Sequence, residues 1–339
     1  MSAVLRAGVI GLGMMGRHHA RVLHALDGVE LVAVADEVGD RLGAAQGAPV
    51  VGSVDELLRV GIDVAVVATP TATHEEVGLR LASAGVHTLI EKPVAVDAAA
   101  AARLVAAFDR AGLVGAVGHI ERYNAALQAL RQRLDAGELG DVFQIATRRQ
   151  GPFPDRIADV GVVKDLATHD IDVTTWIARS PYASISAHAT TKSGRLHEDL
   201  VAVSGRLEDG TVTSHLVNWL SPFKERVVVV TGARGAYVAD TLTADLTFHE
   251  NGTERTSWDQ LAAFRGVAEG ASTRFAIPKR EPLVLEHEAF RDAVLGRRQD
   301  VVTLADGMRT VAVADRVITS ARTGTVSIVD HAAAGGGAG

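Results

Sequence analysis

The chain has 339 residues, of which 47% are hydrophobic and 22% charged, a balance typical of a soluble globular protein with about two domains. Its formal net charge of −7 argues against nucleic acid or an anionic membrane as a general partner. The absence of cysteine excludes disulfides, thiolate metal sites and a cysteine nucleophile.

The first part of the chain alternates short apolar strands with helical patterns, and it begins with a buried strand rather than a cationic signal peptide. This alternation predicts an α/β domain over residues 1–121, with a doubly wound parallel sheet of the Rossmann type. No apolar run approaches the roughly 20 residues of a membrane helix, so we expect a cytoplasmic protein. The strands are expected at 4–10, 29–35, 49–51, 63–68, 86–91 and 113–118, and the helices near 14–26, 38–46, 54–59, 73–84 and 97–111.

A glycine-rich motif follows the first strand. It reads Gly11-Leu12-Gly13-Met14-Met15-Gly16, and a second apolar run ends in Asp36, twenty positions after Gly16. In this pattern the first glycine permits a tight turn, the second lets the backbone approach a pyrophosphate, and the third lets helix and strand pack closely. The helix N-terminus faces the phosphate charge, and Asp36 accepts hydrogen bonds from the adenosine ribose. The motif therefore predicts dinucleotide binding, with Met14 and Met15 in the phosphate-binding turn.

The acidic residues after the second strand favour NAD over NADP. Glu37 follows Asp36, and two carboxylates would repel a 2′-phosphate. Arg41 qualifies this expectation, because it lies one helical turn further on and could fold back toward the adenosine. Its simpler interpretation is a solvated helix position. We expect NAD as the cofactor, with Arg41 at the edge of its site.

Two further motifs follow later strands, where an open parallel sheet binds its ligands. One strand ends at Thr69-Pro70, with His74 starting the next helix, and the following strand ends at Glu91-Lys92-Pro93. A residue before proline favours extended geometry, so Lys92 is expected to project from the sheet edge beside a nicotinamide pocket. The alternative is that both prolines merely end strands and that Lys92 is solvated.

The pattern changes near residue 120. Residues 122–330 are expected to form an α+β domain, in which a large open, mainly antiparallel sheet carries helices on one side. Asp209-Gly210 and Asn251-Gly252 are hairpin signals, and residues 331–339 are expected to be a disordered tail. The expected helices lie at 122–136, about 165–178, 282–296 and 305–322, and the first strand lies near 141–150.

A polar motif lies on the second of these helices. Asp165, His169, Asp172 and Trp176 would share one helical face, which is unusual for a helix that packs on a core. An imidazole with a reference pKa near 6.5 suits a general base for an alcohol proton. The alternatives are a structural histidine, an aspartate that only favours the helix N-terminus, or a zinc site. Zinc is least favoured because no third clear ligand accompanies the pair, so we expect no metal.

The order and separation of these motifs resemble the glucose-fructose oxidoreductase / inositol dehydrogenase / MocA family of NAD(P)-dependent sugar dehydrogenases. The resemblance covers about residues 4–330. It implies a Rossmann domain joined to an α/β domain with a large open sheet, a substrate pocket between the domains, and pairing through that sheet as a homodimer or homotetramer. By position, Lys92 would bind the reacting hydroxyl and the nicotinamide ribose, His169 would be the acid/base, and Asp165 would bind substrate or tune the base. The implied cofactor-binding set is Gly11, Gly13, Met14, Met15, Gly16, Asp36, Arg41, Thr69, Pro70, His74, Glu91 and Lys92.

Finer features resemble the UDP-N-acetylglucosamine 3-dehydrogenases. One is the stretch from Gly118 to Asn124, and the other runs from Arg148 through Val163. At the end of the second stretch, Val162-Val163-Lys164 replaces a glycine-rich segment of many relatives. Arginine matches phosphate oxygens in bidentate geometry, but Arg148 and Arg149 face opposite sides of a strand, so a salt-bridge role is expected for at least one arginine. The expected substrate-binding set is His119, Glu121, Tyr123, Asn124, Arg149, Arg156, Asp165 and His169.

These features together predict an NAD-dependent enzyme that oxidises C3 of UDP-N-acetylglucosamine or a close UDP-sugar. His169 would remove the hydroxyl proton as hydride leaves C3 for the nicotinamide, and Lys92 would stabilise the developing alkoxide. Three alternatives remain open at this point. They are an inositol or free-sugar dehydrogenase, a nucleotide-ketosugar reductase, and a non-catalytic NAD or sugar sensor, which would have no need of a base opposite the nicotinamide.

Overall fold

The computed structural model describes residues 4–153, 160–252, 254–255, 268–298 and 300–329. The chain divides into two compact units. Unit 1 comprises residues 1–120 and 281–315, and unit 2 comprises residues 121–280 and 316–339. The first boundary lies one residue from the expected one. Residues 281–315, which the sequence analysis placed in the second domain, cluster instead with the N-terminal unit.

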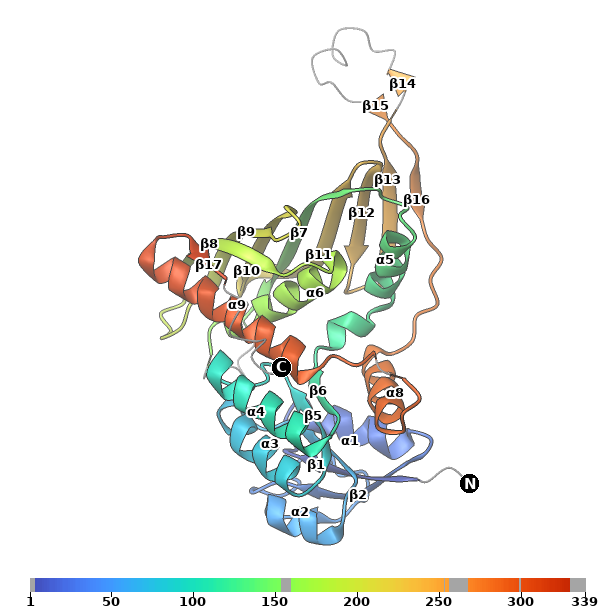
Figure 1. The fold of residues 1–339 in the computed structure, drawn as a ribbon, viewed down its shortest axis with the longest axis vertical. Helices are drawn as coiled ribbons and strands as arrows, with labels where there is room; N and C mark the ends of the chain where they lie inside the picture. Colours follow the sequence, from blue (N-terminus) through green and yellow to red (C-terminus); the bar gives the residue numbers. More distant parts are fainter. Residues whose placement is uncertain (1–3, 154–159, 253, 256–267, 299, 330–339) are drawn as a thin grey trace. The chain divides into compact units, whose positions relative to one another are not determined.

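Unit 1 is built on a parallel sheet with the strand order β3-β2-β1-β4-β5-β6, the order of a dinucleotide-binding fold. Its strands β1, β2, β5 and β6 are labelled in Figure 1. The expected strands are all formed, and their apolar residues supply the core that α1 and α8 cover. The strands are β1 (Leu5–Ile10), β2 (Val29–Ala35), β3 (Val50–Val51), β4 (Val64–Val67), β5 (His87–Glu91) and β6 (Gly115–Gly118). The helices are α1 (Gly16–Ala25), α2 (Val54–Val60), α3 (His74–Ser83), α4 (Ala98–Ala111) and α8 (Pro282–Val294), and α9 (Leu304–Thr323) starts here and continues into unit 2.

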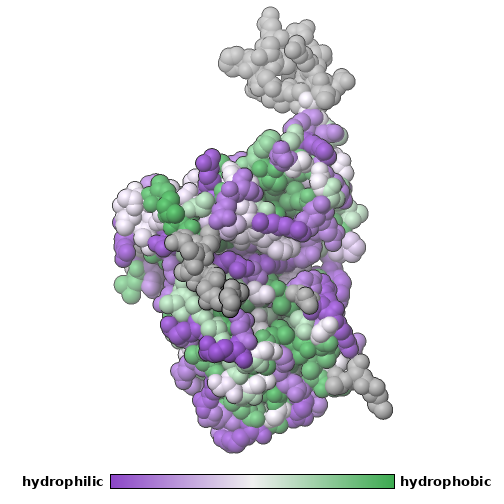
Figure 2. Space-filling view, viewed as in Figure 1, coloured by the Kyte–Doolittle hydropathy of each residue, from purple (hydrophilic) through white to green (hydrophobic). Residues whose placement is uncertain are grey.

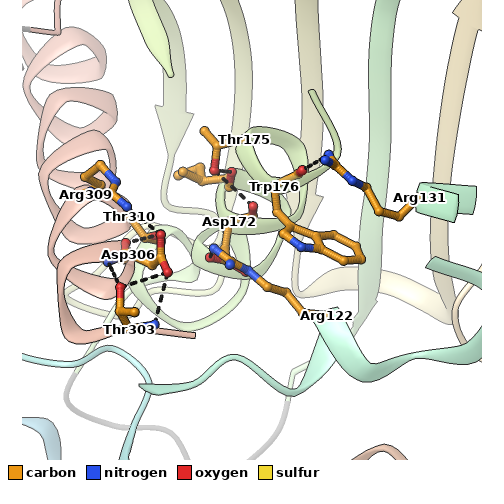
Figure 3. Close-up of polar contacts among 10 residues, drawn as sticks. Arg122, Arg131, Asp172, Thr175, Trp176, Thr303, Asp306, Arg309 and Thr310 are labelled. Atoms are coloured by element: carbon orange, nitrogen blue, oxygen red, sulfur yellow. Dashed lines mark hydrogen bonds and ion pairs between the residues drawn. The ribbon is translucent and has the colours of Figure 1, made fainter. Parts of the chain in front are cut away.

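Local capping explains where several of these helices begin. The side chains of Ser53 and Asp97 accept the N–H groups of residues three positions later, at 3.3 and 2.8 Å, and so cap α2 and α4. At the start of α9, Thr303 and Asp306 cap one another's backbone N–H groups reciprocally, at 3.0 and 3.1 Å (Figure 3). These boundaries therefore follow from short-range hydrogen bonding.

The helix expected at 38–46 is wrong, because residues 37–47 form turns instead. Gly39, Gly43 and Gly47 have φ angles of 74°, 64° and 81°, in the left-handed region that ends helices. The Asp40 carboxylate accepts the N–H groups of Leu42, Ala44 and Ala45, at 3.3, 2.7 and 2.9 Å. Side-chain hydrogen bonds of this kind offer the backbone an alternative to a helix.

Unit 2 contains a mixed, mostly antiparallel sheet with the strand order β16-β13-β12-β11-β7-β10-β9-β8-β17. The β7–β10 pair is parallel, which makes the sheet mixed. The strands are β7 (Val142–Pro152), β8 (Tyr182–Thr190), β9 (Leu200–Leu207), β10 (Val212–Asn218), β11 (Leu220–Gly232), β12 (Gly235–Asp240), β13 (Asp245–Glu250), β16 (Ser272–Arg274) and β17 (Ser327–Ile328), with β14 (Glu254–Arg255) and β15 (Ala268–Glu269) as a separate pair. The helices are α5 (Ala125–Asp135) and α6 (Thr168–Ala178), with short turns η2 (Ile120–Tyr123) and η3 (Val163–Ala167) before them.

The two faces of this sheet differ. Apolar residues of α5 and α6, such as Leu130 and Val173, pack with Ile145, Val228 and Val230 into one buried cluster. Alternate residues on the same strands point to the other face, which α5 and α6 do not cover (Figure 1). The sheet with helices on one side is therefore as predicted.

The two hairpin signals have different outcomes. Gly210, with a φ of 93°, lies in the turn that joins the paired strands β9 and β10, as expected. Asn251 and Gly252 lie between β13 and β14, which do not pair with one another, so the second signal is wrong. An Asp-Gly or Asn-Gly pair forms a hairpin turn only where the strands on either side of it pair with one another.

The surface carries mixed chemistry. On the face shown in Figure 2, hydrophilic and hydrophobic residues alternate over both units. Among the helices of the described residues, none combines the length and apolarity that crossing a bilayer requires.

Candidate functional site

The motifs of unit 1 converge on one edge of its parallel sheet. The glycine-rich turn follows β1, Thr69 follows β4 and Lys92 follows β5, and these three strands are neighbours in the sheet. Because all strands are parallel, these three segments leave the sheet at its carboxyl edge. The β1–β4 step is also the point where the strand order reverses, which is where such folds bind their ligands.

The glycine-rich turn leaves space where a phosphate would have to approach. A Cβ at Gly13 would meet nothing within 4 Å, whereas a Cβ at Gly16 would overlap the carbonyl oxygen of Gly11. Gly11 itself has a φ of 88° and lies against the backbone of Ala68. Within the part of the chain that the structure describes, no side chain caps the N-terminus of α1 at Met15, so the positive end of the helix dipole is available to an anion. The turn therefore fits a dinucleotide pyrophosphate.

Asp36 lies beside this turn at the end of β2. Its carboxylate accepts the N–H of Leu12 at 2.7 Å and the N–H of Val38 at 2.9 Å. This contact holds the acid next to the glycine motif, where the ribose of a bound dinucleotide belongs. Arg41 is exposed and lies in the turns of residues 37–47 rather than on a helix. Met14 is also exposed, and its sulfur accepts a hydrogen bond from Arg17.

His74 joins the loops that follow β4 and β5. Its Nε2 lies 2.9 Å from the carbonyl oxygen of Thr69, and its Nδ1 lies 2.9 Å from the carbonyl oxygen of Pro93. The side chain is buried, and burial lowers the pKa of His74 even though both carbonyls favour its charged form. His74 thus links the backbone of Thr69 to that of Pro93, the residue after Lys92.

Glu91 and Lys92 end the fifth strand. The Glu91 carboxylate is buried, accepts the backbone N–H of Lys92 at 3.0 Å and contacts His19 of α1 at 2.9 Å. Burial opposes its ionisation, but the hydrogen bond and charge of His19, with the charge of Lys92, lower the pKa of Glu91 below its ordinary value. The Glu91 side chain is therefore used for contacts inside unit 1, and Lys92 is the next residue, at the carboxyl edge of the sheet.

In unit 2 the polar helix begins differently from the expected one. Residues 163–167 form a π-turn, and the α-helix α6 starts only at Thr168. The wider turn changes the angle between Asp165 and His169, so the single face predicted from regular helical spacing does not extend through Asp165. Asp165 is buried and His169 is half-buried. A π-turn inside a helix is frequent at functional sites.

Glu198 was missed by sequence reasoning. Its backbone carbonyl accepts the N–H of Val162 at 2.9 Å, and its carboxylate accepts the N–H of Val163 at 3.1 Å. A Cβ at Gly161 would overlap this carboxylate, so the glycine makes room for it. Glu198 thereby caps the π-turn that carries Asp165. The only signal in the sequence was Gly161 before the helix, and glycine alone does not identify its neighbour.

The arginines of β7 form ion pairs within the protein. Arg149 is buried between Asp170 of α6, at 3.1 Å, and Glu121, at 2.8 Å. Although burial opposes its charge, these two carboxylates raise the pKa of Arg149. Arg148 pairs with Glu225 at 2.8 Å, so the salt-bridge role expected for at least one arginine is confirmed. Arg156 lies outside the described residues.

Two other residues of the expected substrate set also have structural contacts. Asn124 caps α5 by accepting the N–H of Ala126 at 3.0 Å and donates to the carbonyl of Thr241 at 2.9 Å. Glu121 accepts from Arg149, as above. His119 is buried directly after β6, and Tyr123 is half-buried in η2. His119 belongs to unit 1, whereas Glu121, Tyr123 and Asn124 belong to unit 2.

Two arginines bind α6, one through the side chain of Asp172 and the other through backbone carbonyls at the end of the helix. Arg122 donates to both carboxylate oxygens of Asp172, at 2.8 and 2.6 Å, and both side chains are largely buried (Figure 3). Arg131 donates to the carbonyl of Trp176 (Figure 3) and to that of Ile177, at the end of the helix. Asp172 is therefore an internal ion-pair partner. Among the described residues, no group of three or more His, Asp and Glu side chains could hold a metal ion.

Comparisons with known proteins agree with this arrangement. Residues 5–119 match a model described as "Oxidoreductase family, NAD-binding Rossmann fold", and residues 127–238 match a "GFO/IDH/MocA C-terminal domain". The UDP-N-acetylglucosamine 3-dehydrogenase of Acidithiobacillus ferrooxidans is 30% identical over 92% of this chain and 96% of its own length. Its solved structure superposes with a TM-score of 0.82 at 28% identity, over 94% of this chain and 98% of that one.

Two further proteins are nearly as similar. Inositol 2-dehydrogenase 2 of Saccharopolyspora erythraea is 29% identical over 97% of this chain and 96% of its own length. The structure of GenD2 from gentamicin A biosynthesis, in complex with NAD, has a TM-score of 0.81 at 27% identity and covers 97% of each chain.

Proposed function

The chain belongs to the GFO/IDH/MocA family of NAD-binding oxidoreductases, and from this premise we propose that it oxidises C3 of UDP-N-acetylglucosamine or a close UDP-sugar. The observation that carries the proposal is the full-length similarity to a UDP-N-acetylglucosamine 3-dehydrogenase. The stretches from Gly118 to Asn124 and from Arg148 to Val163 support it from the sequence. A cytoplasmic location, where NAD is available, is part of the same proposal.

We assign cofactor binding to the carboxyl edge of the sheet in unit 1. The turn from Gly11 to Gly16 holds the pyrophosphate, Asp36 holds the adenosine ribose, and Thr69 and Lys92 lie at the nicotinamide end. When bound, NAD supplies the nicotinamide ring that accepts a hydride. The chain itself supplies position and charge.

Three side chains carry the remaining chemistry in this proposal. His169 removes the proton of the sugar hydroxyl, because imidazole is a side chain suited to general-base catalysis and His169 is only half-buried. The ammonium of Lys92 stabilises the alkoxide that develops as this proton leaves. Asp165, on the π-turn that precedes His169, binds substrate or tunes the base. His119 and Tyr123 complete the proposed substrate contacts.

The arginines take different parts in this proposal. Arg156 is the side chain assigned to the substrate diphosphate. Arg149 has its guanidinium occupied by Asp170 and Glu121, so we assign it, with Glu121 and Asn124, to holding the substrate-binding segments in place. This departs from the direct phosphate contact that the sequence suggested for Arg149.

An inositol dehydrogenase is the second candidate. The observation that favours it is the similarity to Inositol 2-dehydrogenase 2, whose identity is within a percentage point of the first relative. An inositol has no diphosphate, so Arg156 would then have no anionic partner in the substrate.

We further propose that the protein forms a homodimer or homotetramer through the open face of the sheet in unit 2. A shallow hollow on this face is lined by alternate strand residues, including Arg148, Ser204, Leu216, Val227 and Val229. Apolar residues that are exposed together on one face are typical of interaction surfaces.

The deciding experiment measures NADH formation with a panel of sugars and a carbonyl trap. The panel contains UDP-N-acetylglucosamine, its uronic acid, UDP-glucose, myo-inositol and glucose. We expect turnover with a UDP-N-acetyl sugar, slowed by deuterium at C3, and a loss of about 100-fold or more in kcat for Lys92→Ala while NAD still binds. Turnover on inositol alone would establish the second candidate, and near-normal turnover of the lysine variant would remove Lys92 from the mechanism.

A further inference from the structure

Three buried side chains of unit 1 form a hydrogen-bonded chain that ends next to Lys92. His19 lies on α1, Glu91 ends β5 and His287 lies on α8. His19 Nε2 is 2.9 Å from Glu91 Oε1, and His19 Nδ1 is 2.8 Å from His287 Nε2. The other oxygen of Glu91 accepts the backbone N–H of Lys92 at 3.0 Å. The chain therefore connects the helix that starts at the glycine turn with the segment that carries Lys92.

The protonation of this chain can be derived from its partners. Glu91 is ionised near neutral pH and can only accept, so His19 Nε2 must carry a hydrogen. Burial lowers the pKa of His287 well below its ordinary value, which makes that imidazole neutral. His287 Nε2 and His19 Nδ1 share one hydrogen across the 2.8 Å contact between them. Hydrogen bonds consequently link His287, His19 and Glu91 in a row, and the His19 ring is held at both of its nitrogens.

The Glu91 carboxylate is confined on its remaining sides. A Cβ at Gly118 would approach its carboxyl carbon to 3.2 Å, so a side chain there would require the carboxylate to shift by a few tenths of an ångström. Glu286 of α8 is also buried, and burial together with the charge of Glu91 raises the pKa of Glu286 well above its ordinary value. A neutral Glu286 adds no second negative charge. The carboxylate of Glu91 therefore has little room to move, and its side-chain donor among the described residues is His19.

We propose that His19 is a positioning residue for Lys92, that it acts through the Glu91 carboxylate, and that His287 orients His19 for this task. Holding the end of a strand does not require a buried charge, since apolar packing does so without the cost of desolvating a carboxylate. A chain of buried hydrogen bonds instead fixes the backbone from which Lys92 projects relative to the cofactor-binding helix. This inference rests on the proposed function, because it treats Lys92 as a group that acts on substrate.

The kinetic test compares two variants at His19. His19→Leu removes the donor to Glu91, whereas His19→Gln offers an amide N–H near the place of Nε2. We expect His19→Leu to lower kcat at least about tenfold, while the KM for sugar and the dissociation constant for NAD change less than about twofold. His19→Gln should recover most of the rate. His24→Leu, an exposed histidine on the same helix, is the matched control and should behave as the wild type.

A second readout does not depend on turnover. Lys92 is the only lysine before Lys164, so peptide mass spectrometry can follow its labelling by an amine-reactive reagent. We expect Lys92 to be labelled several-fold faster in His19→Leu, while exposed Lys224 is unchanged. A wild type that oxidises no sugar but shows this change in labelling would refute the proposed function and support the inference.

Other outcomes would overturn the inference. Unchanged kcat together with unchanged labelling of Lys92 would do so, and so would a loss of NAD affinity as large as the loss of rate. If His19→Leu does not fold, His287→Leu carries the test, because it leaves the donor to Glu91 in place and removes only its orientation. We expect a three- to fivefold loss of kcat from that variant, and wild-type kcat there would contradict the proposal.

Discussion

Gly11, Gly13 and Gly16 differ in what a side chain at each position would meet. Gly11 needs a positive φ, Gly16 lies against the carbonyl of Gly11, and Gly13 faces open space. Gly11 and Gly16 are therefore required by the fold of the turn itself. Gly13 is not, and the space beside it is open to a ligand. At the same scale, buried side chains such as His74 and Glu91 matter through the backbone groups that they hold.

Glu286 offers a residue-scale prediction about stability. Both of its carboxyl oxygens are buried without a hydrogen-bond partner among the described residues. Its raised pKa means that the folded state keeps a proton that the unfolded chain releases above about pH 4.3, so stability falls as pH rises from there toward the folded-state pKa. We expect Glu286→Met to raise the free energy of unfolding at pH 8 by about 1–3 kcal/mol, and by less at pH 5.

Urea denaturation at the two pH values measures this effect. Glu76→Met, at an exposed position of α3, is the control and should change stability by no more than about 0.5 kcal/mol. An equal gain from Glu286→Met at pH 5 and pH 8 would contradict the raised pKa.

At the scale of elements, α6 is fixed to its sheet by charges as well as by apolar packing. Asp170 pairs with Arg149 of β7, Asp172 pairs with Arg122, and Glu198 caps the preceding π-turn. The regular helical spacing of Asp165, His169 and Asp172 predicted a single polar stripe for chemistry. The structure does not form this single stripe. Asp172 is in an ion pair with Arg122, and the π-turn changes the direction of Asp165 relative to His169.

Arg149→Met tests this division. Removing one partner of a buried ion pair leaves the carboxylate of Asp170 uncompensated, so we expect the free energy of unfolding to fall by about 3–5 kcal/mol. Arg148→Met, on the exposed side of the same strand, should cost no more than about 1 kcal/mol. Thermal and urea unfolding of both variants provide the comparison. A raised KM for substrate with unchanged stability of Arg149→Met would instead restore the phosphate-binding role.

At the scale of the whole molecule, two units with different sheets share one chain, and the chain crosses between them more than once. Unit 1 recruits α8 from near the C-terminus to cover its core, and α9 runs from unit 1 into unit 2. Unit 2 covers one face of its sheet with α5 and α6, and these two helices leave the other face of the described strands bare.

Leu216→Glu tests the proposed pairing through that bare face. Leu216 of β10 is 37% exposed there, and a buried carboxylate at an interface would cost several kcal/mol. We expect the wild type to be a dimer or tetramer in light scattering and the variant to have the mass of a monomer. Leu42→Glu is the control, because Leu42 is 65% exposed in the turns of unit 1 and should not alter the mass. A monomeric wild type would refute the pairing.

The sequence by itself determined the parallel sheet, the glycine turn, the acid at Asp36 and the two helices of unit 2. Each of these depends on period, glycine placement or short-range capping, and such signals are local in the chain. Position at the end of an apolar strand also sufficed to place Thr69 and Lys92 at the carboxyl edge of the sheet.

Only the tertiary structure decided which unit α8 joins, which arginines are neutralised, and how His19, Glu91 and His287 meet. These features join residues that are far apart in the chain, such as His19 and His287, and no local pattern encodes such a contact. The turns at 37–47 and the π-turn before α6 differ from regular periodicity for a related reason. A side chain there, from Asp40 or Glu198, binds the backbone and outweighs the weak intrinsic preference for a regular helix.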